Sequence, residues 1–245
     1  MKSKLINLSI ALGITIIFGV IIVIAYANTK SRFILMLGGE MPAGIIQLLT
    51  YFVFIYGLLE VKRFDQWVTN EMNAFKLNIL PTKEQFVLSP DEVSEIKLKV
   101  LSLQNSNKYL LLDMITKACT KFRSNKSVSE ALEIVNTQTD INFRNSDTEQ
   151  NIIKYFAWTI QSLGLIGTVI GIANSLYFVN DIVNPEGIKK VTHLLSFAFD
   201  TTLVAISLSV ILLYYFNIVS EKMDKLHSNN QEYIIENLIN RIYAK

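Results

Sequence analysis

Four long apolar stretches constrain this chain more than any other feature of its sequence. About 20 apolar residues in a helix cross the roughly 30 Å hydrocarbon core of a bilayer. The stretches cover residues 5–27, 42–59, 155–178 and about 191–219, and Asp200 is the one formally charged residue within them. The mean hydropathy of +0.34 is too high for an ordinary soluble domain of this size. The sequence therefore predicts an all-α membrane protein with four transmembrane helices.

The first stretch has an alternative interpretation as a cleaved secretory signal. Lys2 and Lys4 precede it, and small residues at Ala25 and Ala27 resemble a cleavage site. Its apolar core is longer than the roughly 7–15 residues of a signal sequence. We therefore expect a retained span, and cleavage would leave three spans with the same orientation.

Basic residues at the ends of the stretches predict the orientation. One side carries Lys2, Lys4, Lys62, Arg63, Arg144, Lys154, Lys222 and Lys225, and the other carries Lys30, Arg32, Lys189 and Lys190. The side richer in Lys and Arg is normally cytoplasmic. Both termini are then cytoplasmic, and two short loops, around 28–41 and 179–190, face outward.

The apolar pattern also predicts how the chain is divided. We expect the first two spans within 1–60, a cytoplasmic helical segment at 61–154, two further spans at 155–219, and a cytoplasmic helix at 220–245. The last two spans are expected to extend into the cytoplasm.

The cytoplasmic segment shows helical periodicity. Apolar residues recur at helical spacing over 93–122 and predict one or two amphipathic helices after a loop marked by Pro81 and Pro90. Ser127 and Glu130 have the spacing of a capping box, which predicts a short helix there. Another helix is expected to run from about Asp147 into the third span.

The C-terminal segment carries an apolar stripe that needs a partner. The stripe consists of Ile234, Ile235, Leu238, Ile239 and Ile242. It packs either on the 93–135 helices of the same chain or between subunits.

Several kinds of chemistry find no support in the sequence. The net charge is +2 with no long basic run, which disfavours nucleic acid as a partner. His193 and His227 have no partners at metal-ligand spacing, and Cys119 lies on the packed face of a predicted helix. No nucleophile or phosphate-loop motif is present. We expect no enzyme activity and no cofactor.

Small residues form one face on each of the last two spans, and such faces let helices pack closely in lipid. The third span carries Gly164, Thr168, Gly171 and Ser175, and the fourth carries Ala198, Thr202, Ala205 and Ser209, both at i, i+4, i+7 and i+11. The two faces either pack together or line a common cavity, where Thr168 and Thr202 offer hydroxyl groups.

Asp200 lies on another face, about 200° around the helix from Thr202 at ~100° per residue. Ser196, Leu203 and Ser207 share that face. A carboxylate within a span is costly and is typical of a functional site. A polar bond to a neighbouring helix, or a place near the outer interface, is the alternative.

The segments LGLIGTVIGIANSL and AFDTTLVAISLSVILLYYFN resemble the MotA/TolQ/ExbB proton-channel family. In that family five copies form a ring around two copies of a single-span partner, similar to MotB, ExbD or TolR, whose membrane aspartate takes and releases the ion. The resemblance places pore-facing threonines at Thr168 and Thr202, with Thr201 beside the second. Three departures stand out. Gln161 and Ser162 occupy the region of a frequent proline, Phe197 replaces a glutamate of some members, and Asp200 offers an ionisable group on a different face, to which the glutamate's role is not transferred. Four spans match the flagellar stators, whereas the transport-energising members have three.

The resemblance implies a ring-forming subunit of an H+- or Na+-driven motor in the bacterial inner membrane. The residues expected to line its ion pathway are Thr168, Thr202, Thr201 and Asp200. A non-transporting four-helix scaffold is the alternative. The residues expected to pack the helices are Gly164, Gly167, Gly171, Ser175, Ala198 and Ala205.

Overall fold

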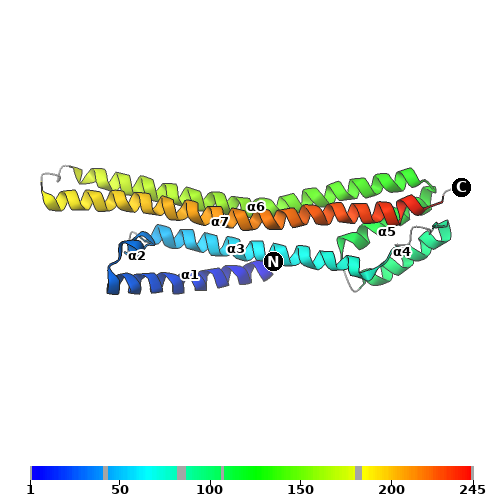
Figure 1. The fold of residues 1–245 in the computed structure, drawn as a ribbon, viewed down its shortest axis with the longest axis horizontal. Coiled ribbons are helices and arrows are strands. Elements are labelled where there is room, and N and C mark those ends of the chain that lie inside the picture. Colours follow the sequence, from blue (N-terminus) through cyan, green and yellow to red (C-terminus); the bar gives the residue numbers. More distant parts are fainter. Residues whose placement is uncertain (1, 41–43, 82–86, 106–107, 180–183, 244–245) are drawn as a thin grey trace. The chain divides into compact units, whose positions relative to one another are not determined.

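The computed structural model describes residues 2–40, 44–81, 87–105, 108–179 and 184–243. Every regular element in those ranges is a helix (Figure 1). Two parts of the expected outer loops, residue 41 and residues 180–183, lie outside the described residues.

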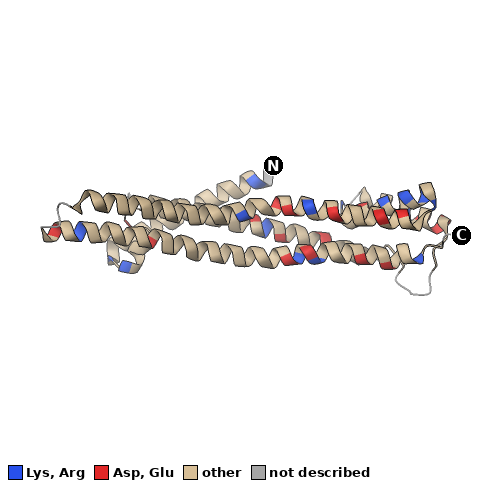
Figure 2. Cartoon of the chain, turned by 90° about the horizontal axis from the view of Figure 1, so that it is seen from above, with Lys and Arg blue, Asp and Glu red and all other residues tan. Residues whose placement is uncertain are grey.

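Four helices are long and apolar enough to cross a membrane, as the sequence predicts. They are α1 (Lys2–Thr29), α3 (Ile45–Met72), α6 (Val128–Tyr177) and α7 (Pro185–Asn237). The last three extend well beyond their apolar stretches into charged sequence, and Figure 2 shows that α6 and α7 each have one long part with few charges and one part rich in charges. The extension of the third and fourth spans as continuous helices is confirmed.

The chain divides into two units, and each is described by itself. Unit 1 comprises Met1–Arg63 and Asn151–Asn217, and unit 2 comprises Phe64–Gln150 and Ile218–Lys245. Because α3, α6 and α7 are long, each contributes residues to both units. Within each unit, α6 and α7 lie side by side (Figures 1 and 2).

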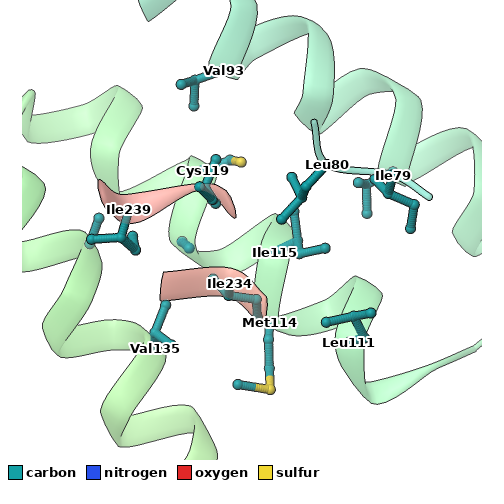
Figure 3. Close-up of a cluster of buried hydrophobic side chains, with 14 of the residues drawn as sticks. Ile79, Leu80, Val93, Leu111, Met114, Ile115, Cys119, Val135, Ile234 and Ile239 are labelled. Atoms are coloured by element: carbon teal, nitrogen blue, oxygen red, sulfur yellow. The ribbon is translucent and has the colours of Figure 1, made fainter. Parts of the chain in front are cut away.

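Unit 2 has an apolar core built on α4 (Pro90–Gln104) and α5 (Leu110–Asn125), the two amphipathic helices that periodicity predicts. Figure 3 shows Ile234 and Ile239 among side chains of this core. The C-terminal stripe therefore packs against helices of its own chain, the first of the two alternatives. Cys119 is buried in the same core, and burial raises the pKa of its thiol to about 12.

The prediction of a short helix beginning at Ser127 is wrong in the length of that helix. Ser127 does accept a hydrogen bond from the Glu130 amide at 3.3 Å, but the helix continues for 50 residues to Tyr177. The Glu130 carboxylate contacts Lys121 at 2.8 Å and Asn125. A complete capping box instead begins α4, where Ser89 and Glu92 each accept a bond from the other's backbone amide.

Candidate functional site

The small-residue faces of α6 and α7 meet inside unit 1 and form a seam. A Cβ atom added to Gly164 would lie 2.5 Å from the Cβ of Ala205, and one added to Gly171 would lie 2.7 Å from the Cβ of Ala198. Contacts this short mean that only hydrogen fits at these positions. Glycine therefore permits the close backbone approach that holds helices together in lipid.

Thr201 fills the space that Gly167 leaves open. A Cβ added to Gly167 would lie 2.5 Å from Thr201 Oγ1. The Thr201 side chain is 2 % exposed, and its hydroxyl donates to the Ala198 carbonyl at 2.8 Å. Thr201 thus acts as a packing residue of the seam.

Thr168 and Thr202 meet across the seam, and their hydroxyl groups contact each other. The Thr168 hydroxyl also lies 3.2 Å from the Gly164 carbonyl oxygen and 3.1 Å from that of Ala198. The Thr202 hydroxyl lies 3.0 Å from the Gly164 carbonyl oxygen. Both side chains are half-buried.

The hydroxyl groups of Thr168 and Thr202 and the carbonyl groups of Gly164 and Ala198 form an acceptor-rich cluster. A threonine hydroxyl has one hydrogen and two lone pairs. Two hydrogens are therefore shared among two hydroxyl and two carbonyl oxygens. Such a cluster is suited to accept a hydrogen bond from a protonated acid, or to ligate a cation, and is poorly suited to a carboxylate anion.

A further polar contact extends the seam where the resemblance expects a proline. Gln161 donates from Nε2 to Ser209 Oγ at 3.0 Å, and Ser209 donates to the Ala157 carbonyl at 3.2 Å. Ser175 is also buried, and its hydroxyl donates within α6 to the Ile172 carbonyl. No proline-induced kink is needed to bring a polar side chain into this interface.

Asp200 does not join the threonine cluster. Its carboxylate is paired with Arg32 of α2 (Arg32–Met36), with Nη1 to Oδ2 at 2.6 Å and Nη2 to Oδ1 at 2.8 Å. Arg32 Nη2 also lies 2.6 Å from Ser196 Oγ. Asp200 is only 7 % exposed.

Sequence reasoning missed this partner of Asp200. The charge pattern predicts only that Arg32 is a basic residue on the expected outer side. The signal was available, because a carboxylate in an apolar span needs a cation, and the connection between the first two spans contains two, Lys30 and Arg32. The partner could not be chosen from sequence, since 168 residues separate the two.

In the part of the chain that the structure describes, no group of three or more His, Cys, Asp or Glu side chains could hold a metal ion. His193 lies 3.0 Å from Glu40 at the same end of α7 as Asp200. His227 is buried in unit 2 and contacts Ser146 at 3.0 Å.

Comparison with known proteins relates this geometry to a family. The family model described as MotA/TolQ/ExbB proton channel family matches residues 106–232, more than half of the 245-residue chain. Searches of curated proteins and of solved structures found no match. The matched range includes α5, α6 and most of α7, and therefore both threonines and every residue of the seam. With four helices apolar enough to span a bilayer, this chain is a multi-pass membrane protein that belongs to the MotA/TolQ/ExbB proton channel family.

Proposed function

We propose that the chain is the ring-forming subunit of an ion-driven membrane motor. It works with a single-span partner whose membrane aspartate carries the ion, H+ or Na+. The observation that carries this proposal is the acceptor-rich cluster of Thr168 and Thr202 in an otherwise apolar seam. Membership of a family of proton channels supports it.

The threonine cluster gives the proposed cycle its physical basis. An ionised carboxylate is costly at membrane depth, and the cluster has few donors to offer it. Once protonated, the partner's acid becomes neutral and can donate its hydrogen to Thr168 or Thr202. The acid can then pass this zone, and the ring advances one step. One charge moving through 100 mV supplies only ~2.3 kcal/mol, so each step must be small.

The proposed assembly has five copies of this chain around two copies of the partner, in the bacterial inner membrane with both termini in the cytoplasm. Unit 1 exposes many large apolar side chains on α6 and α7, such as Leu165, Val169, Phe199 and Val210. Such surfaces suit contact with lipid or with another subunit. Unit 2, with its apolar core and charged exterior, then carries the motion to another component.

A first experiment measures composition. The chain is expressed together with any single-span, aspartate-bearing protein encoded by an adjacent gene, and the mass of the detergent-purified complex is determined. Five copies with two of the partner are expected. A monomer or dimer that ignores the partner would count against the motor.

A second experiment measures ion flux through the reconstituted complex. Thr202→Val and Thr168→Val keep the shape of the side chain and remove the hydroxyl, so flux should fall sharply in both. Thr159→Val is the matched control, because Thr159 in α6 makes the same bond to the carbonyl four residues earlier, to Tyr155 at 2.8 Å. Undiminished flux in both test variants would exclude the cluster from the path.

A second candidate function is a non-transporting membrane scaffold. One observation favours it: Thr168 and Thr202 satisfy each other and two carbonyls within a single chain, which also holds α6 to α7. In that case the valine variants lower thermal stability, and the unmodified complex conducts no ions.

A further inference from the structure

The connection between the first two spans is attached to the fourth span by an ion pair. Arg32 lies in α2, between α1 and α3, and binds both carboxylate oxygens of Asp200. Its second amino group also reaches Ser196 Oγ. Two parallel N–H contacts from a planar guanidinium define an orientation as well as a distance.

The contacts of α7 with this connection form one stripe. His193, Ser196, Asp200, Val204 and Leu208 follow at spacings of three and four residues, which place them on one helical face. His193 meets Glu40 at 3.0 Å. At the other end of the stripe, Val204 and Leu208 belong to an apolar cluster that also includes Ile34, Met36 and Leu37.

This stripe and the seam hold α7 from different sides. Thr202 lies about 200° around the helix from Asp200, at ~100° per residue. On the seam side, small side chains set how closely α6 and α7 approach. On the other side, the bidentate pair opposes rotation of α7 about its own axis. Such a rotation would move the Thr202 hydroxyl away from Thr168 and from the Gly164 carbonyl.

We infer that Arg32 and Asp200 are positioning residues that fix the rotation of α7, and with it the place of Thr202 in the acceptor-rich cluster. Asp200 is then an anchor and not a carrier of the transported ion. This inference rests on the proposed function for the meaning of the cluster, although the positioning itself can be measured without it.

The contacts of Asp200 argue against a role as carrier of the transported ion. Both oxygens of Asp200 are occupied by Arg32, and the residue is 7 % exposed. A guanidinium stays protonated in proteins and cannot hand on a proton. A carboxylate held this way already has its counter-ion within the same chain.

The test uses three variants: Arg32→Gln, Asp200→Asn and the double variant. Each is reconstituted as the full complex for ion flux. The Asp200 side chain is 10 % exposed and that of Arg32 57 %. Arg32→Gln leaves the buried carboxylate without its cation, and Asp200→Asn removes the group that orients the guanidinium, so each single variant should slow flux about tenfold or more. The double variant pairs two neutral amides and should recover most of the flux. Glu40→Gln is the control, because its partner His193 lies on the same stripe but both side chains of that pair are exposed, so no buried charge is left unpaired and the change should matter little.

A second readout reports the position of α7 directly. Thr168→Cys and Thr202→Cys are introduced with Cys119→Ala, which removes the one native cysteine. With Arg32 and Asp200 unchanged, a disulfide should form readily between the two introduced cysteines. It should not form in Arg32→Gln, and it should form again when Arg32→Gln is combined with Asp200→Asn. If Arg32→Gln yields no folded protein, Arg32→Lys replaces it. Lysine keeps the positive charge but cannot make the two parallel contacts of the guanidinium, so crosslinking should be reduced.

The outcomes separate the inference from the proposed function. Normal crosslinking in Arg32→Gln and Arg32→Lys overturns the positioning role. If the unmodified complex conducts ions and the double variant crosslinks normally but conducts none, the inference is also overturned. Asp200 is then a carrier of the transported ion. If the unmodified complex conducts no ions, the proposed function fails, and loss and recovery of the crosslink still support positioning.

Discussion

The same pair of helices is packed by different chemistry in the two units. In unit 1, α6 and α7 meet through glycine, alanine and threonine, and an added Cβ at Gly164 or Gly167 would lie 2.5 Å from its neighbour. In unit 2 the buried positions carry long apolar side chains such as Leu226 and Ile234. Lipid tails provide no hydrophobic drive between helices, so close contact must hold unit 1 together. Burial of apolar area can stabilise unit 2.

Unit 2 also buries uncharged polar residues between its parts of α6 and α7. Gln150 accepts from Ser220 at 2.9 Å, and Ser146 contacts His227 at 3.0 Å. Asn230 is 1 % exposed, and neither side-chain polar atom has a partner among the described protein groups. The seam of unit 1 thus satisfies its hydroxyl groups, whereas unit 2 contains a buried amide that costs stability.

The largest effect is expected from Gly167→Leu in unit 1. The new Cβ would lie 2.5 Å from Thr201 Oγ1 and 2.7 Å from its Cβ, and this β-branched side chain has no room to withdraw. The helices must separate, at a cost beyond the ~1–3 kcal/mol of ordinary overpacking. Little monodisperse protein should be recovered on size-exclusion chromatography. Gly13→Leu is the control, because nothing lies within 4 Å of that position. Equal recovery of the two variants would contradict a tight seam.

Phe122→Ala should be the next largest change, and it tests the core of unit 2. Phe122 is 1 % exposed, and truncation of a buried phenylalanine costs ~3–5 kcal/mol. Unfolding is followed by the fluorescence of Trp67 in unit 2 after Trp158→Phe, since the chain has two tryptophans. Leu98→Ala, at a residue that is 65 % exposed, should change the midpoint little. A similar loss in both variants would show that this core is not the source of stability.

Asn230→Leu is expected to stabilise unit 2. An unpaired buried polar group costs ~1–3 kcal/mol, and leucine removes that cost at the price of slight overpacking. The midpoint of Trp67 fluorescence should rise. Asn229→Leu, at the exposed neighbour, should stay within about 0.5 kcal/mol of the parent. A lower midpoint in Asn230→Leu would indicate that a bound water or another group satisfies the amide.

Ser89→Ala should destabilise unit 2 by ~1 kcal/mol, the usual effect of losing an N-cap. The Ser89 hydroxyl accepts from the Glu92 amide at 3.3 Å and begins α4. Chemical denaturation of the parent and the variant measures the difference. Ser102→Ala, within the same helix and exposed, provides the comparison and should have little effect.

The smallest effect concerns the pH dependence of this cap. Hydrogen bonds from the Ser89 amide and hydroxyl hold the pKa of Glu92 below its ordinary 4.5. A carboxyl group with a lowered pKa in the folded state stabilises above its unfolded pKa, and this contribution is lost as pH falls through the folded value. The stability difference between the parent and Glu92→Gln should therefore shrink from pH 7 to pH 3. A constant difference would mean that the charge of Glu92 does not matter.

The seam was predictable because its signal is local. Small residues at helical spacing on adjacent spans predict two faces that can meet, and the structure brings Gly164, Gly171, Ala198 and Ala205 together. The cap at Ser127 was predicted only in part. Its spacing marks a helix start, but Glu130 has the competing cation Lys121 within reach, and spacing cannot rank those partners.

The sequence by itself determined the four spans, the continuous helices beyond them and the faces of the last two spans. Length, hydropathy and periodicity are properties of the chain before it packs. Only the tertiary structure decided that Asp200 pairs with Arg32 and that the C-terminal stripe joins the core of unit 2. It also decided that Thr168 and Thr202 share the Gly164 carbonyl. Except for Thr168 and Gly164, these partners lie far apart in sequence, so their choice depends on which surfaces meet when the helices pack.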